Sequence, residues 1–105
     1  MINDLDLALK MADHADEISH KRFKAVDLLV ETKPDRSPVT DADKASEEAI
    51  RALLKSHRPD DGIVGEEFGN DTGGADRYWV IDPIDGTKNF LRGVPTWATL
   101  IGLIE

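Results

Sequence analysis

The chain has 105 residues, no cysteine and a formal net charge of −8, and hydrophobic residues make up 40% of it. This length allows one domain at most, or part of one, and the apolar content is sufficient for a packed core. The lack of cysteine excludes disulfides, cysteine-bound zinc and a thiol nucleophile, and the acidic balance argues against nucleic acids and anionic membranes as partners.

The first half of the chain predicts two amphipathic helices. In residues 4–23 apolar side chains recur at spacings of three and four, which is the pattern of a helix with one buried face. A second helix is expected after Thr40, because Asp43 follows three residues later as in a capping box. Proline cannot continue a helix, so this second helix ends before Pro59.

Short strands separated by loops are predicted between and after these helices, and the sequence therefore predicts an α+β fold. Strands are expected at residues 26–32, 62–65, 78–81 and 95–104, with a helical turn at 88–92. Loops are expected at residues 33–38, which contain two prolines, and at 70–76, which are polar and rich in glycine. Lys33 and Arg36 are interpreted as residues of a solvated turn rather than as contacts to a phosphate.

Two acidic clusters stand at the predicted ends of strands. Glu66 and Glu67 follow the first of these strands, and Asp82 and Asp85 follow the next. Carboxylates gathered in one place repel one another unless a cation lies between them. The Asp82 and Asp85 side chains can meet one metal ion, with the Ile84 carbonyl as a third oxygen, and Mg²⁺ takes ligands of this kind.

The second cluster continues into a turn that suits an anion. Gly86 and Thr87 offer backbone N–H groups there, and glycine lets the chain approach an oxyanion closely. Metal ligands beside such a turn predict a divalent-metal phosphate site, in which bound Mg²⁺ reverses the repulsion between an acidic protein and a phosphate. Taken alone, the glutamates would more often be solvated loop residues, and the aspartates would be ordinary turn formers.

These residues also match the signature of a known family. Residues 79–90, preceded by residues 65–67, resemble the inositol monophosphatase-like phosphatases, in which an apolar strand runs into Asp-Pro-(Ile/Leu)-Asp-Gly-Thr-x-Asn-Phe. Residues 38–43 are similar to the Val-Thr-x-x-Asp sequence with which the family begins its second helix. The resemblance implies a layered αβαβα fold, of which residues 1–105 are the N-terminal portion of a single phosphatase domain whose C-terminal half is absent.

The resemblance implies a role for each matching residue. Two or three Mg²⁺ ions per complete site are implied, with these ligands in this chain: Glu66, Asp82, Asp85 and the carbonyl of Ile84. The substrate phosphate is expected to bind at Asp85, Gly86 and Thr87. Thr87, hydrogen-bonded to Asp43, is expected to position and deprotonate the attacking water, with Glu66 as a further catalytic residue. Glu67 is expected to lie next to the metal ligands and to orient them rather than to be one of them.

The resemblance also implies a reaction and a setting. Residues 65–69 and 85–98 look most like the actinobacterial histidinol-phosphate phosphatases, which implies hydrolysis of L-histidinol phosphate in histidine biosynthesis by a metal-activated water. Inositol 1-phosphate or another sugar phosphate is the alternative substrate. The protein is expected in the cytoplasm, because the acidic N-terminus lacks the basic region of a signal peptide and no apolar stretch can span a bilayer. The resemblance also implies a homodimer, since members of the family are often dimeric.

An alternative of another class is an inactive fragment that binds divalent cations or associates with its missing complement. Family members carry a further metal-binding aspartate in a Trp-Asp-x-(Ala/Gly) motif, and this motif does not occur in the 105 residues. The chain alone is therefore expected to be inactive.

Overall fold

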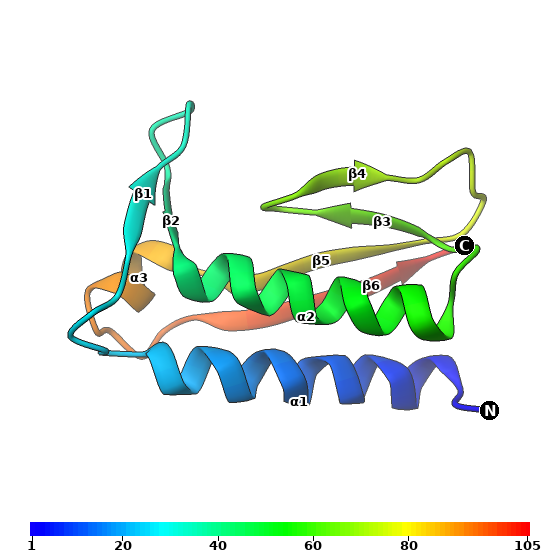
Figure 1. Ribbon diagram of the computed structural model, residues 1–105, viewed down its shortest axis with the longest axis horizontal. Helices are drawn as coiled ribbons and strands as arrows, with labels where there is room; N and C mark the ends of the chain where they lie inside the picture. The colour runs from blue at the N-terminus through cyan, green and yellow to red at the C-terminus, as the bar shows by residue number, and fades with distance from the viewer.

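The computed structural model describes residues 1–105 and packs two long helices on a mixed sheet, with a hairpin and a short helix at one end (Figure 1). The helices are α1 (Asp4–Arg22), α2 (Asp41–His57) and α3 (Thr87–Leu91). The strands are β1 (Val30–Thr32), β2 (Pro38–Thr40), β3 (Gly62–Gly65), β4 (Gly69–Asp71), β5 (Tyr78–Asp85) and β6 (Ala98–Ile104). The two long helices lie side by side and cover one face of the larger sheet (Figure 1).

The topology of the larger sheet decides where the acidic clusters meet. Its strand order is β4-β3-β5-β6, in which β3 and β5 are parallel and the other neighbours are antiparallel. Because β3 and β5 run in the same direction, their carboxyl ends lie at one end of the sheet, with Gly65 paired to Ile81. The acidic residues that follow these two positions are thereby brought to the same place.

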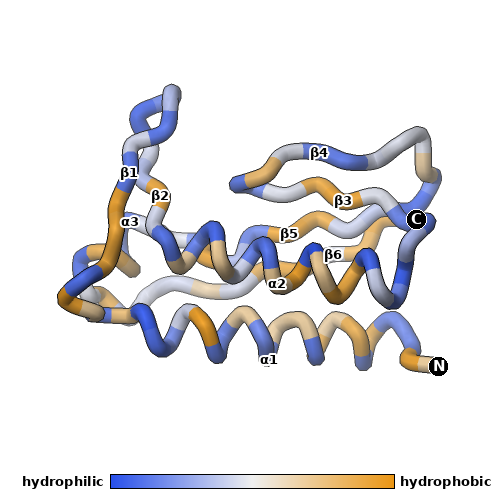
Figure 2. The backbone as a smooth tube through the Cα atoms, viewed as in Figure 1, coloured by the Kyte–Doolittle hydropathy of each residue, from blue (hydrophilic) through white to orange (hydrophobic).

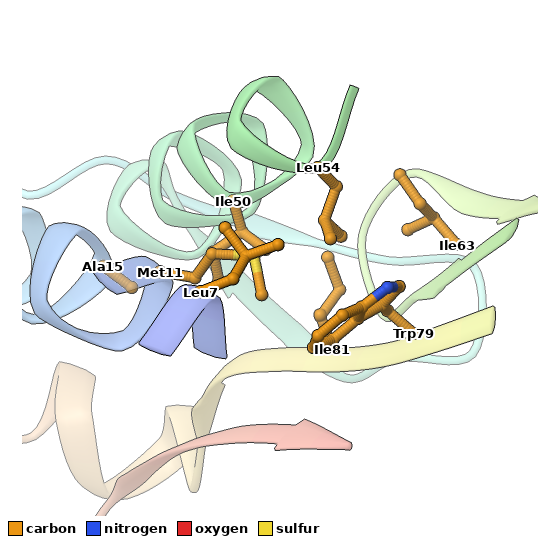
Figure 3. Packing of buried hydrophobic residues seen from close by; sticks show 8 residues of the cluster. All are labelled: Leu7, Met11, Ala15, Ile50, Leu54, Ile63, Trp79 and Ile81. Atoms are coloured by element: carbon orange, nitrogen blue, oxygen red, sulfur yellow. The ribbon is translucent and has the colours of Figure 1, made fainter. Parts of the chain in front are cut away.

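The main core lies between the two long helices and the sheet (Figure 3). It contains eight buried residues: Leu7, Met11, Ala15, Ile50, Leu54, Ile63, Trp79 and Ile81. The largest of these side chains is Trp79, and its indole N–H donates to the Asp61 carboxylate at 2.9 Å, so its one polar atom is satisfied. A second cluster of Ala42, Ile84 and Phe90 lies where β5 passes into α3. This cluster anchors the Asp-rich segment to the body of the protein.

Both predicted helices are confirmed, together with the local interactions expected to start them. Asn3 accepts a hydrogen bond from the Asp6 amide at 2.8 Å at the start of α1. At the start of α2 Thr40 and Asp43 form the predicted capping box, each side chain accepting from the other residue's backbone N–H. None of the three helices combines the length and the apolar character that crossing a membrane requires.

The strand predictions differ from the structure in extent. β1 includes only the last three residues of the predicted strand 26–32, because the chain turns at Ala25–Leu28. The predicted loop 70–76 begins with β4, an exposed edge strand that is hydrophilic, whereas β3 and β5 each contain a hydrophobic stretch (Figure 2). Its pairing with β3 is made by the backbone, so side-chain hydropathy gave no sign of it.

β5 is longer than predicted, and the difference changes the description of the site. The predicted strand 78–81 stopped before the Asp-rich turn, but the structure continues β5 through Asp85. The pairing with β6 changes register there, since Asp82 is opposite Leu100 and Asp85 is opposite Ala98. Such an irregularity re-aims side chains along a strand. The metal-ligand candidates thus belong to the distorted end of a strand rather than to a free turn.

Candidate metal and phosphate site

Six of the predicted site residues line one depression of about 280 Å³ at the carboxyl ends of β3 and β5. They are Glu66, Asp82, Ile84, Asp85, Gly86 and Thr87. The remaining lining residues are Lys33, Ser37, Pro38 and Lys88. The depression is therefore built from four separate parts of the chain: the β1–β2 hairpin, the turn after β3, the end of β5 and the start of α3.

The distorted end of β5 supplies three of the predicted ligands. Asp82 is half-buried and Asp85 is exposed, whereas the side chain of Ile84 is buried and its carbonyl oxygen lies 3.2 Å from Oγ1 of Thr87. Pro83 has no N–H for the ladder, and its carbonyl oxygen lies 3.1 Å from the Thr99 hydroxyl on β6. Burial of Ile84 thus fixes the segment while the two carboxylates remain at the surface of the depression.

The carboxylates in and beside the depression carry more negative charge than the one nearby ammonium, that of Lys33, compensates. The pKa of Asp82 is raised to about 6, first by burial and then by the charges of Glu66, Asp85 and Asp43. Burial is also the main cause that raises the pKa of Glu67, and the nearby Lys33 ammonium opposes that shift. These raised pKa values mean that the charged forms of the carboxylates are disfavoured in the empty site. A cation that binds there stabilises the charged forms, so cation binding is favoured.

Lys33 already supplies one positive charge at this site, and the prediction of a solvated turn for it is wrong. Its Nζ lies 3.2 Å from Oε1 of Glu67 and 3.4 Å from Oε1 of Glu66, and the side chain is only 23% exposed. Burial lowers the pKa of Lys33, but the two glutamates outweigh that effect and the pKa is raised. Sequence reasoning missed this contact because Lys33 and Glu67 are 34 positions apart.

The donor set fits a hard divalent cation. Every candidate ligand is an oxygen, three of them belong to carboxylates, and Mg²⁺ prefers such ligands together with water. The Lys33 ammonium, 3.4 Å from Oε1 of Glu66, shows that this carboxylate already has a cation as its partner. In the present arrangement no three acidic or histidine side chains converge closely enough to enclose an ion. The Ile84 carbonyl and water would therefore have to supply the remaining ligands of a bound ion.

Asp43 and Thr87 form the contact that the resemblance implied. The Thr87 hydroxyl donates to Oδ1 of Asp43 at 2.9 Å, while Oδ2 of Asp43 accepts from the backbone N–H and the hydroxyl of Thr40. Asp43 is 1% exposed, so these bonds hold it in one orientation. The depression does not include Asp43 itself, and the aspartate reaches the site through Thr87. A role of this pair in activating water stays a prediction.

Gly86 shapes the turn between β5 and α3. Its φ of 95° lies in the left-handed region, which favours glycine, and a Cβ added there would lie 3.1 Å from the carbonyl oxygen of Thr96. The sequence predicted a glycine that lets the chain come close to an anion. The structure adds that the same glycine lets the turn pack against the segment before β6.

Comparisons with known proteins identify a matching family and similar proteins. Residues 3–105 match the model of the inositol monophosphatase family. The histidinol-phosphatases of Mycobacterium tuberculosis and Streptomyces coelicolor are 58% and 61% identical over 98% and 99% of this chain. The solved inositol monophosphatase of Thermotoga maritima is 30% identical over 99% of the chain with a TM-score of 0.88.

The matches confirm the α+β fold that the sequence predicted. They also give the size of the matching part. The chain spans 40% and 39% of the two histidinol-phosphatases and 40% of the Thermotoga maritima structure, which is less than half of each relative.

Proposed function

This chain belongs to the inositol monophosphatase family, and from that premise we propose that it carries the metal-holding part of a phosphomonoesterase active site. The reaction is hydrolysis of a phosphate monoester by water, and L-histidinol phosphate is the first substrate to test. Two relatives named histidinol-phosphatase, at 58% and 61% identity, support this choice. Residues 1–105 are then the N-terminal portion of one phosphatase domain.

The observation that carries the proposal is the depression itself. It brings the carboxylates of Glu66, Asp82 and Asp85 to the end of one sheet beside the turn of Gly86 and Thr87. We infer that Glu66, Asp82, Asp85 and the Ile84 carbonyl hold Mg²⁺, with two or three ions in a complete site. Bound Mg²⁺ supplies a lowered pKa for water and neutralisation of charge on the phosphoryl oxygens.

The residues of this chain then orient the reactants. Asp43 accepts the hydrogen of the Thr87 hydroxyl, which leaves the lone pairs of Thr87 Oγ1 able to accept a hydrogen bond from the attacking water. Asp85, Gly86 and Thr87 are the residues proposed to bind the phosphate, and Lys33 and Lys88 line the same depression. The cations at the rim offset the acidic residues for an anionic substrate.

Two other functions have specific support. The match to the Thermotoga maritima inositol monophosphatase favours inositol 1-phosphate, or a sugar phosphate, as the substrate. The limited share of each relative that the chain spans supports an inactive fragment that binds divalent cations or associates with its complement. A cytoplasmic homodimer that acts in histidine biosynthesis belongs to the first proposal.

The test is phosphate release by the full-length protein with Mg²⁺, supplied in turn with L-histidinol phosphate and inositol 1-phosphate. Release from the first compound, its loss in EDTA and its loss in Asp82→Asn are expected. Asp76→Asn changes an exposed aspartate outside the depression and serves as the control. Turnover that survives EDTA or Asp82→Asn would exclude the proposed site, and preference for inositol 1-phosphate would exclude the first substrate.

A further inference from the structure

A carboxylate that the sequence did not single out lies fully buried beneath the turn that carries Glu66. Glu47, on α2, is 0% exposed. Its Oε1 accepts from the backbone N–H of Glu67 at 2.8 Å, and its Oε2 accepts from the N–H of Phe68 at 2.8 Å. A buried charge is tolerated only when it is paired and hydrogen-bonded, and here the partners are the amides of the turn itself.

Arg51 completes this arrangement one helical turn further along α2. Its Nε donates to Oε2 of Glu47 at 2.9 Å, and its Nη2 donates to the carbonyl oxygen of Gly69. The carboxylate of Glu47 is therefore neutralised by an arginine that also holds the far end of the same turn. Glu47 and Arg51 thus hydrogen-bond three backbone groups of residues 67–69: two N–H groups and one carbonyl.

The absence of a side chain at Gly65 allows this close approach. A Cβ added at Gly65 would collide with Oε2 of Glu47 and would lie 2.6 Å from Nη2 of Arg51. The φ of Gly65 is not positive, so space rather than backbone conformation requires glycine there. The Glu47 carboxylate lies directly against the end of β3, immediately before Glu66.

The same helix also fixes the other half of the site. Asp43 and Glu47 are four residues apart and share one face of α2, and Asp43 accepts from the Thr87 hydroxyl. One rigid element therefore sets the position of the Glu66 turn through Glu47 and of the Thr87 turn through Asp43. An ion pair between Glu47 and Arg51 that served stability alone would not need the amides of Glu67 and Phe68 as partners. Both oxygens of Glu47 accept from these amides, which directly follow the candidate metal ligand Glu66.

We propose that Glu47 is a positioning residue for the metal site, which holds the turn after β3 so that the Glu66 carboxylate faces Asp82. This inference rests on the proposed function. Partners that orient metal ligands typically contribute a factor of about 10–100 to metal affinity. Glu47→Gln keeps the size of the side chain but presents an amide to one of the two backbone N–H groups, so about tenfold weaker binding is expected.

The test is calorimetric titration of the full-length protein with Mn²⁺, well below the melting temperature of each variant. Glu47→Gln is expected to weaken binding about tenfold and to accelerate hydrogen exchange of the Glu67 and Phe68 amides. Ile50→Val, a buried change on the same helix, should lower the melting temperature and leave the Mn²⁺ affinity unchanged.

A second variant covers the case in which Glu47→Gln does not fold. Gly65→Ala retains the carboxylate but pushes it from the turn, and it should also weaken Mn²⁺ binding, whereas Gly102→Ala meets open space and should not. Variants of both sites that bind Mn²⁺ as the parent does would overturn the inference and leave the proposed function standing. A parent protein that binds no Mn²⁺ would overturn the proposed function and this inference with it.

Discussion

Lys33 Nζ lies 3.2 Å from Oε1 of Glu67, and this ion pair joins the β1–β2 hairpin to the turn after β3. The Glu67 side chain is only 3% exposed, whereas Glu66, the second partner of the same lysine, is 56% exposed. Lys33 thus binds one carboxylate that is part of the scaffold and one that is free to take another partner. A divalent cation at Glu66 has to compete with the lysine ammonium for that second carboxylate.

Removing the lysine charge should therefore tighten cation binding. Lys33→Met eliminates a competitor whose partly exposed ion pair contributes up to about 1 kcal/mol, which corresponds to about two- to fivefold higher Mn²⁺ affinity. Calorimetric titration at moderate ionic strength measures the change. Lys44→Met is the matched control, since Lys44 pairs with the exposed Glu31 at 3.2 Å outside the depression. Unchanged or weaker binding in Lys33→Met would contradict competition at Glu66.

Asp82 should destabilise the metal-free protein at neutral pH. Its pKa is raised to about 6 from 3.8, so the folded state holds a proton that the unfolded state has lost between these values. The stability of the folded state therefore falls as the pH rises through this window. Asp82→Asn should raise the free energy of unfolding at pH 7 by about 1 kcal/mol, a value reduced to allow for solvent screening of a half-exposed group.

Urea unfolding in EDTA at pH 4 and pH 7 measures this effect. The gain from Asp82→Asn should be present at pH 7 and nearly absent at pH 4, where the parent carboxyl is protonated in the folded state. Asp76→Asn, at an exposed position, should show no such difference. A destabilised Asp82→Asn at pH 7 without metal would show that the aspartate is structurally required. Stability gained together with activity lost is the usual sign of a functional residue.

The left-handed turn at Gly86 should tolerate no side chain. Gly86→Ala combines a positive φ with a Cβ 3.1 Å from the carbonyl oxygen of Thr96, and a loss of about 2 kcal/mol of unfolding free energy is expected. Gly69→Ala separates the two causes, because its φ is also positive but its Cβ meets open space, so about 1 kcal/mol is expected. Equal losses in urea unfolding would mean that the contact with Thr96 has no cost.

The features that could be predicted from the sequence are those whose residues lie close together along the chain. The segment from Asp82 to Thr87 is contiguous, so its residue types and spacing indicate a metal and phosphate site without knowledge of the fold. The amphipathic patterns of α1 and α2 were likewise sufficient to place both helices. The meeting of Glu66 with Asp82 required one further assumption, that β3 and β5 are parallel neighbours.

The parts that the sequence did not reveal depend on contacts across longer separations. Lys33 reaches Glu67 over 34 positions, and Glu47 reaches Glu67 over 20 positions. A charged residue in a loop or helix is usually solvated, so neither residue type nor helical spacing marks these two as parts of the site. β4 was missed for a related reason, since a polar edge strand is defined by its backbone partner and not by its own side chains.

The hydroxyl of Thr87 should matter for turnover as well as for folding. Thr87→Val keeps the shape of the side chain but leaves Oδ1 of the buried Asp43 without its donor, which should lower the unfolding free energy by about 1–3 kcal/mol. If the pair prepares water for attack, kcat of the full-length protein should also fall by about 100-fold, the scale of positioned proton transfer. Thr87→Ser restores the hydroxyl and should recover most of kcat. A purely structural contact would instead leave kcat intact in Thr87→Val below its melting temperature, and this comparison decides whether Asp43 acts through Thr87.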